Sequence, residues 1–96
     1  MIVKFSGKVV LIAGGTGGLG HAVSLAFLSE GAKVVVTYRN QKEFDALRSA
    51  AGTNGSSLEG RRVDVTDEAA VRELIDTVFT KYGRLDGLVN NFSIRC

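Results

Sequence analysis

The sequence predicts an α/β fold in which parallel strands alternate with helices along one small domain. Two short apolar runs rich in β-branched residues, residues 8–13 and Lys33–Tyr38, predict strands that are buried on both faces. Longer stretches between such runs carry apolar residues at helical spacing. A glycine-rich segment joins the first strand to the first helix. Right-handed crossovers between these elements predict a doubly wound sheet with helices on both faces and the strand order 3-2-1-4.

The first half of the chain is expected to hold two helices. The first covers residues 18–30 and ends at Gly31, and the second begins after Asn40 as N-cap, with Glu43 in a capping-box relation to it. The residues expected on the inner face of the first helix are Leu19, Val23, Ala26 and Phe27, and those of the second are Phe44, Leu47 and Ala51.

The second half is expected to continue the same alternation. A polar loop over Gly52–Ser57 precedes a third strand near residues 58–65, and a final strand runs from Leu85 to about Asn90. The helix between these strands has Thr66 as its expected N-cap and Gly83 as its end. Its apolar positions follow helical spacing: Val71, Leu74, Ile75, Val78, Phe79 and Tyr82.

Composition excludes several classes of protein. The chain has 96 residues, 45% of them hydrophobic, and a net charge of +2 without a basic run, which gives no reason to expect nucleic acid or a membrane surface as partner. Its apolar runs are too short to span a bilayer. The one cysteine, Cys96, excludes an internal disulfide and a cysteine-based metal site. We therefore expect a cytoplasmic protein without a metal.

The bend after the first strand is expected to bind phosphate. It comprises Gly14, Gly15, Thr16, Gly17, Gly18, Leu19 and Gly20. A sharp turn, a close approach of backbone to a diphosphate and tight packing of helix on strand each favour glycine, and the N–H groups at the start of the following helix attract anions. The bend therefore predicts a Rossmann-type dinucleotide site.

Two other phosphate-binding classes fit less well. A nucleoside-triphosphate loop needs a lysine followed by a serine or threonine directly after the glycines, where this chain has His21 and Ala22. A phospho-acceptor domain would need acidic residues at the end of the first strand, where Ala13 and Gly14 stand instead.

The end of the second strand favours NADP(H) over NAD(H). An acidic residue there would bind the adenine ribose of NAD, whereas an arginine accommodates the 2′-phosphate of NADP. The strand closes with Tyr38, Arg39 and Asn40, and Arg39 follows Gly20 by nineteen residues, which suits the expected reach. Its guanidinium could stack on adenine and bind the phosphate through two hydrogen bonds.

At this point the chain resembles the short-chain dehydrogenase/reductase family. The family pattern Thr-Gly-x-x-x-Gly-x-Gly is matched from Ala13 to Gly20, except that Ala13 stands in place of the threonine, whose hydroxyl helps to organise the turn. By resemblance, Asp64 would accept a hydrogen bond from the adenine amino group, with the backbone of Val65 beside it. An alternative for Asp64 is a purely local part in the turn that enters the next helix.

The resemblance also covers the fourth strand, which ends in the family with Asn-Asn-Ala-Gly. By resemblance, Asn90 and Asn91 would order the strand end beside the ribose of the cofactor. Here Phe92 and Ser93 replace the alanine and glycine, and a bulky ring at this close approach could obstruct the adenosine side of the pocket.

The family's catalytic residues are not found in this sequence. They are a serine, a tyrosine and a lysine four residues beyond the tyrosine, carried downstream of the fourth strand. Tyr38 and Lys42 have the bare spacing, but Tyr38 ends a strand and Lys42 begins a helix, whereas the pair needs one face of one helix. Tyr82 is followed at that interval by Asp86. We therefore assign no catalytic residue.

Residues 1–96 are thus expected to form a single partial NAD(P)-binding domain. The leading hypothesis is the NADP(H)-binding portion of an oxidoreductase that transfers hydride between nicotinamide and an alcohol or carbonyl carbon, inactive on its own. The alternatives are a non-catalytic nucleotide-binding or protein-interaction module, and an enzyme completed by a second chain. The uncovered strand edge predicts self-association or a partner chain.

Overall fold

The computed structural model describes residues 5–14, 16–64 and 66–90. The elements that it places in this part of the chain are β1 (Val9–Ala13), α1 (Gly18–Ser29), β2 (Lys33–Tyr38), α2 (Gln41–Ala51), the short 3₁₀ helix η1 (Gly52–Ser57), β3 (Leu58–Arg62), α3 (Glu68–Tyr82) and β4 (Gly87–Asn90).

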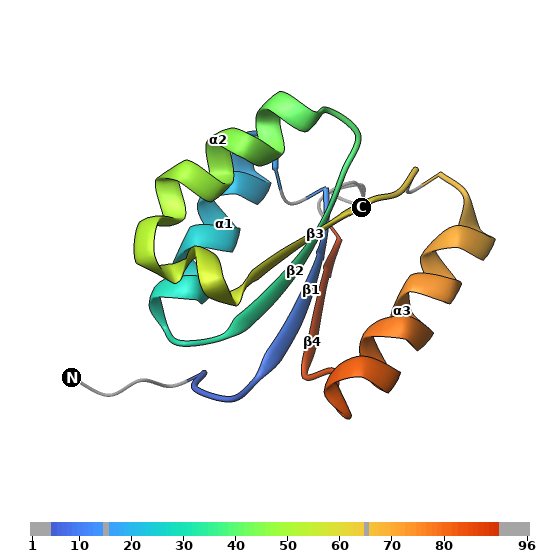
Figure 1. Cartoon of the computed structure of the whole chain (residues 1–96). Helices are drawn as coiled ribbons and strands as arrows, with labels where there is room; N and C mark the ends of the chain where they lie inside the picture. The colour runs from blue at the N-terminus through green and yellow to red at the C-terminus, as the bar shows by residue number, and fades with distance from the viewer. Residues whose placement is uncertain (1–4, 15, 65, 91–96) are drawn as a thin grey trace.

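The described strands form one parallel sheet in the order β3-β2-β1-β4, as the sequence predicts. Val10 of β1 is paired with Val34 of β2 on one side and with Gly87 of β4 on the other, and Val34 is paired in turn with Leu58 of β3. Helices α1 and α2 cover one face of the sheet and α3 covers the other (Figure 1). The doubly wound, Rossmann-type architecture is therefore confirmed.

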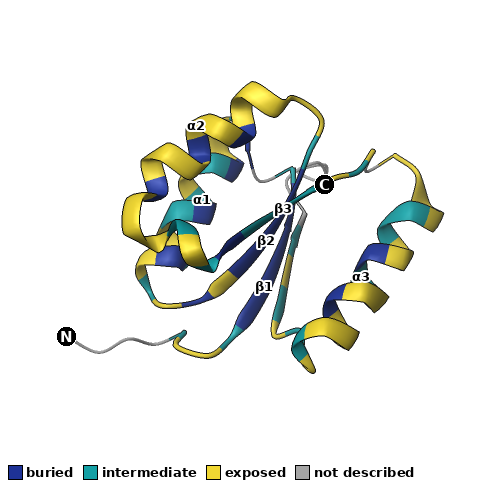
Figure 2. Ribbon diagram, viewed as in Figure 1, coloured by how far each residue is buried: buried dark blue, intermediate teal, exposed yellow. Residues whose placement is uncertain are grey.

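The strands are buried because both of their faces are covered. All five residues of β1 are buried, and alternate residues contact opposite layers. Val10 and Ile12 pack with Phe44 and Leu47 of the α2 layer, whereas Leu11 packs with α3. Figure 2 shows the buried central strands between helices whose outer surfaces are exposed. The continuous apolar runs of β1 and β2 thus reflect burial on both faces.

The inner face of α1 differs in part from the prediction. The buried residues of α1 are Gly20, Ser24 and Leu28, whereas Leu19 is 60% exposed. Val23 and Phe27 are partly buried and pack against the core, as predicted, whereas Ala26 is exposed. Two of the buried positions, Gly20 and Ser24, are small residues that hydrophobic spacing does not mark. The predicted inner face of α2 is confirmed, since Phe44, Leu47 and Ala51 are buried.

The entry to α3 also differs from the prediction. Asp67, not Thr66, is the N-cap, and its side chain accepts a hydrogen bond from the backbone N–H of Ala70 at 3.2 Å. Thr66 instead donates to Asp64. Gly83 ends the helix as predicted, at a φ of 74°. β3 is shorter than predicted and ends at Arg62, because the chain turns towards α3 from Val63 onward.

No helix among the described residues combines the length and the apolar character that crossing a membrane requires.

Candidate functional site: the carboxyl edge of the sheet

The glycine bend lies where the sequence predicts it, between the carboxyl end of β1 and the start of α1. Gly14 has a φ of 73° and Gly18 a φ of 47°, both in the left-handed region that residues with a Cβ atom rarely adopt. Gly17 is the N-cap of α1, and no side chain of the described residues caps it. The backbone N–H groups of the first helical turn therefore begin directly behind the bend, where an anion is stabilised by them and by the helix dipole.

Thr37 fixes the bend to the neighbouring strand. Its hydroxyl accepts a hydrogen bond from the backbone N–H of Gly14 at 2.7 Å, and the residue is almost fully buried in β2. Sequence analysis did not assign this role to Thr37. The sequence feature that could have indicated this role is a hydroxyl near the end of a mostly apolar strand. Ala13 lacks the threonine hydroxyl of the family pattern. Thr37 supplies a hydroxyl to the bend from the adjacent strand instead.

A carboxylate from α2 also lies at the bend. Thr16 is buried, and its hydroxyl is 3.4 Å from Oε1 of Glu43, to which it donates. Asn40 caps α2 as predicted, since its side chain accepts from the backbone N–H of Lys42 at 2.9 Å. The other half of the predicted capping box, a bond from the Glu43 side chain back to the N–H of the N-cap residue, is wrong, because that side chain turns towards α1.

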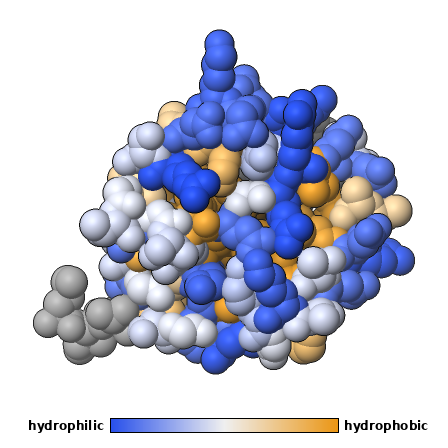
Figure 3. Space-filling model, viewed as in Figure 1, coloured by the Kyte–Doolittle hydropathy of each residue, from blue (hydrophilic) through white to orange (hydrophobic). Residues whose placement is uncertain are grey.

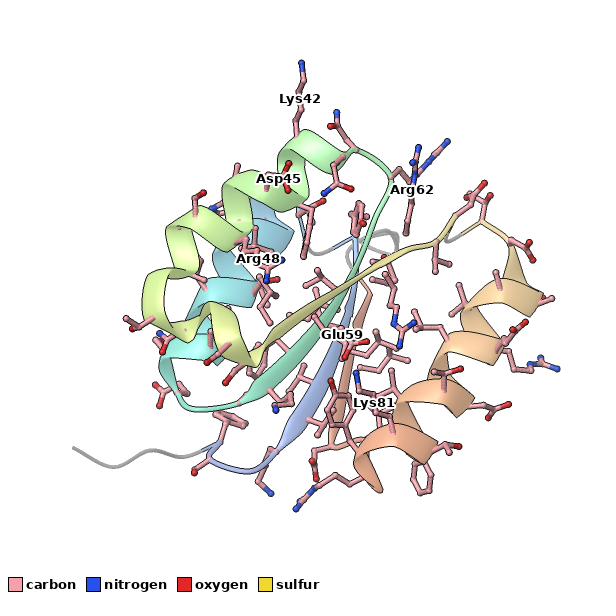
Figure 4. All side chains as sticks on the ribbon, viewed as in Figure 1. Lys42, Asp45, Arg48, Glu59, Arg62 and Lys81 are labelled. Carbon is pink, nitrogen blue, oxygen red and sulfur yellow. The ribbon has the colours of Figure 1, made fainter. Side chains whose placement is uncertain are left out.

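At the same edge of the sheet, an open pocket of about 930 Å³ lies across the ends of β2 and β3. Arg39 and Asp64, both predicted as cofactor residues, line it together. Its remaining lining residues are Tyr38, Asn40, Gln41, Lys42, Arg62 and Val63. Figure 4 shows Lys42 at the start of α2 and Arg62 at the end of β3, both at this edge of the sheet. The sequence did not predict Lys42 or Arg62 as part of the site, although Arg62 ends β3 and Lys42 follows the end of β2 by four residues.

Asp64 is held by the turn that leads into α3. Its Oδ1 accepts from the hydroxyl of Thr66 at 2.6 Å and from the backbone N–H of Thr66 at 2.9 Å. The hydroxyl bond, then the backbone bond, and finally the positive charge of Arg39 lower the pKa of Asp64 below its usual value. Asp64 therefore has the local part in the turn that was one of its two expected roles, and it faces the pocket as an ionised carboxylate.

The remaining predicted residues are placed only in part. The backbone of Asn90 ends β4 and is paired with Ala13 of β1, which brings the end of β4 beside the start of the bend. Gly15 and Val65 lie outside the described residues, as do Asn91, Phe92 and Ser93.

Tyr38 and Lys42 belong to different elements, as the sequence predicts. The Tyr38 hydroxyl donates to Gln41 at 3.2 Å, and its ring stacks on that of Phe44 with the centroids 4.7 Å apart. Lys42 extends away from the ribbon at the start of α2 (Figure 4). The pair therefore does not lie on one face of one helix.

Comparison with known proteins matches this arrangement to one family. The family model for short chain dehydrogenases matches residues 8–96. A short chain dehydrogenase/reductase of Colletotrichum higginsianum is 40% identical over 89 residues, which are 93% of this chain and 33% of that protein. A 3-oxoacyl-[acyl-carrier-protein] reductase of Thermotoga maritima is 36% identical over 96% of this chain and 37% of its own length.

Solved structures have the same fold. The glucose dehydrogenase of Caenorhabditis elegans in its apo form superposes with a TM-score of 0.81 at 35% identity, over 92% of this chain and 38% of that protein. ElxO, whose structure has NADP bound, superposes with a TM-score of 0.79 at 38% identity, over 88% of this chain and 34% of its own. The chain spans between about a third and about half of the length of the first curated relatives that it matches.

Proposed function

Because this chain belongs to the short-chain dehydrogenase family, we propose that it is the NADP(H)-binding portion of an oxidoreductase. The whole protein would transfer hydride between nicotinamide and an alcohol or carbonyl carbon. One observation carries the proposal: the glycine bend and the uncapped start of α1 lie at the same carboxyl edge of the sheet as a pocket lined by three cationic side chains, Arg39, Lys42 and Arg62. Such an edge suits a ligand with separate anionic groups.

In the proposed complex, the bend holds the diphosphate. Backbone N–H groups of the bend would donate to it, other than those of Gly14 and Gly20, which donate to Thr37 and Gly17, together with the positive end of the α1 dipole. Asp64 and the backbone of Val65 would bind the adenine, and Asn90 would order the end of β4 beside a ribose. Thr37 would keep the bend in shape through its bond to the N–H of Gly14.

The preference for NADP(H) over NAD(H) is based on charge. Arg39 stands where β2 ends, and Lys42 and Arg62 line the same pocket. Three cations around one pocket favour the cofactor that carries an additional phosphate dianion. The structure of ElxO, a relative over this region, contains NADP.

The hydride-transfer step is proposed for the whole protein and not for these residues. The sequence has no Tyr-x-x-x-Lys pattern within one helix, and the relatives are two to three times as long. We propose that this stretch binds cofactor and does not reduce substrate on its own. The cytoplasmic location stays a prediction from the sequence.

A protein-interaction module is the second candidate, favoured by the open edge of β4. Leu88 is paired with Leu11, so its side chain lies on the α3 face of the sheet, yet it is 54% exposed. Phe79 on α3 is 57% exposed. Another strand added along β4, from a longer chain or from a second copy, would cover such apolar surface. An interaction module without a nucleotide site would bind neither cofactor.

The test is a titration of the chain with NADPH and with NADH, repeated on Arg39→Ala. Loss of a charge-assisted contact to the 2′-phosphate should weaken NADPH binding by roughly 1.5–3 kcal/mol and leave NADH binding nearly unchanged. Arg72→Ala is the matched control, because Arg72 is exposed on α3, on the opposite layer. Equal losses for both cofactors would refute the role of Arg39, and binding of neither by the unaltered chain would refute the proposed function.

A further inference from the structure

The side chain of Glu43 is directed at the part of the bend that the proposed cofactor must approach. Its Oε1 accepts from the hydroxyl of Thr16 at 3.4 Å. A Cβ atom added at Gly17 would lie 3.6 Å from Oε1 and 3.8 Å from Oε2. Both oxygens therefore face the backbone of the residue that caps α1.

This placement does not follow from the local needs of α2. Asn40 caps that helix through its side chain, and the backbone N–H of Glu43 is itself bonded to the carbonyl oxygen of Asn40 at 3.1 Å. The carboxylate instead reaches a bend 27 residues earlier in the chain, next to the positive end of the α1 dipole.

The sequence position of Glu43 is close to the one from which dinucleotide-binding folds select their cofactor. In dinucleotide-binding folds, an acidic group about twenty residues after the glycines binds the adenine ribose hydroxyls. Arg39 occupies the end of β2, but Glu43 follows Gly20 by 23 residues and returns a carboxylate to the bend from the first turn of α2. The chain thus carries a basic group directly after β2 and an acidic group that α2 directs at the bend after β1.

At the adenine ribose of a bound dinucleotide, these two groups would act in opposite directions. A carboxylate accepts hydrogen bonds from the 2′- and 3′-hydroxyls of NAD(H), whereas the 2′-phosphate of NADP(H) would bring a dianion towards it. Arg39 has the reverse preference, because its guanidinium gains a strong partner only when the phosphate is present.

We infer that Glu43 is a cofactor-selectivity residue that favours NAD(H) and opposes Arg39. The inference rests on the proposed function, because it needs a dinucleotide at the carboxyl edge. It adds that the preference for NADP(H) is restrained by a carboxylate from α2, held at Thr16 and Gly17. The balance between the two side chains then sets how strongly one cofactor is preferred.

The test measures the dissociation constants of NADPH and NADH for the chain and for Glu43→Gln. The amide keeps the size of the side chain and one acceptor oxygen but removes the charge. We expect the ratio of the NADH constant to the NADPH constant to rise about three- to tenfold, from the loss of repulsion between partly solvated charges. The rise should come mainly from tighter binding of NADPH.

Asp76→Asn is the matched control for net charge, since Asp76 is exposed on α3. It should leave the ratio unchanged. The inference is overturned if Glu43→Gln leaves the ratio where it was, lowers it, or changes both constants by the same factor. If the unaltered chain binds neither cofactor, the proposed function itself fails; if it binds them and the ratio does not move, only the role of Glu43 fails.

Discussion

The two faces of the sheet differ in the size of the buried apolar cluster that covers them. On the α1/α2 face, the described part of the chain places ten buried residues in one cluster, including Phe44 and Leu47 from α2. On the α3 face the corresponding cluster has five, of which α3 supplies Leu74 and Val78. In the view of Figure 3, patches of apolar surface lie among polar side chains.

Polar contacts supplement the thinner α3 layer. Glu59 of β3 accepts from Lys81 at 2.7 Å and from the hydroxyl of Tyr82, and it also pairs with Arg61. Burial raises the pKa of Glu59, but the two hydrogen bonds and the charges of Arg61 and Lys81 outweigh burial and lower its pKa overall. Figure 4 shows Glu59 and Lys81 between β3 and α3. The layer that carries Glu43 is therefore held mainly by apolar packing, whereas the α3 layer combines a smaller apolar cluster with ion pairs and hydrogen bonds.

The largest expected effect comes from the same truncation on each face. Leu47→Ala should lower the free energy of unfolding by about 3–5 kcal/mol, because Leu47 is fully buried and leaves a cavity that the α1/α2 layer cannot fill. Leu74→Ala should cost about 2–3 kcal/mol, because α3 covers a smaller cluster and can settle onto the sheet. Urea denaturation followed by circular dichroism measures both.

Equal costs for the two truncations would contradict the comparison. If Leu47→Ala leaves no folded chain, the milder pair Leu47→Val and Leu74→Val should show the same order at a smaller cost.

A smaller effect is expected at Gly60, where β3 passes under α2. A Cβ atom there would lie 2.4 Å from Cε1 and 2.5 Å from Cζ of Phe44, whose ring is confined by stacking on Tyr38. Gly60→Ala should therefore lower the free energy of unfolding by about 1–3 kcal/mol. At Gly55 an added Cβ atom would meet its nearest neighbour at an ordinary 3.7 Å. Gly55→Ala, the matched control, should stay within about 1 kcal/mol of the unaltered chain.

Thermal unfolding of the two glycine variants checks this difference. A Gly60→Ala chain as stable as Gly55→Ala would mean that the Phe44 ring moves aside freely, and the packing argument for this layer would be wrong.

The sheet could be predicted from the sequence because its signals are local. The apolar run of β2 has the predicted bounds, and the order β3-β2-β1-β4 follows from the handedness of crossovers. The inner face of α1 is predicted only in part: Val23 and Phe27 pack against the core, but the buried positions also include the small residues Gly20 and Ser24. Periodicity of hydrophobic residues carries no information about close approach by glycine.

The residues of the candidate site also fall into those that the sequence predicts and those that it does not. The positions of the bend and of Arg39 at the carboxyl edge can be predicted from the sequence, because each follows directly after a strand and the ends of parallel strands meet at one edge. Glu43 and Thr37 are missed because their partners, Thr16 and Gly14, are 27 and 23 residues away. A capping-box spacing also assigned Glu43 to its own helix, and only the packing of α1 against α2 decides which N-terminus the carboxylate reaches.

The smallest expected effect concerns the charge-dependent side of the comparison, at Asp86 before β4. Its Oδ2 accepts from the backbone N–H of Val9 at 2.8 Å, and its two oxygens accept from Arg84 at 2.7 Å each. The hydrogen bonds from Arg84, followed by the one from Val9, lower the pKa of Asp86 from 3.8 to about 2. A folded-state pKa below the unfolded one contributes stability above about pH 4, which is lost as the pH falls towards 2.

Asp86→Asn should therefore reduce stability at neutral pH and make it fall less steeply between about pH 4 and pH 2, because a group that no longer titrates cannot be protonated. Glu59 and Asp64 also have lowered pKa values, so part of the acid dependence remains in the variant. Urea midpoints measured across this range give the slope, with Asp76→Asn as the charge control. An unchanged slope would mean that the contacts of Asp86 with Arg84 and Val9 do not hold β1 to β4, and the contrast between packed and charged layers would lose its support at that point.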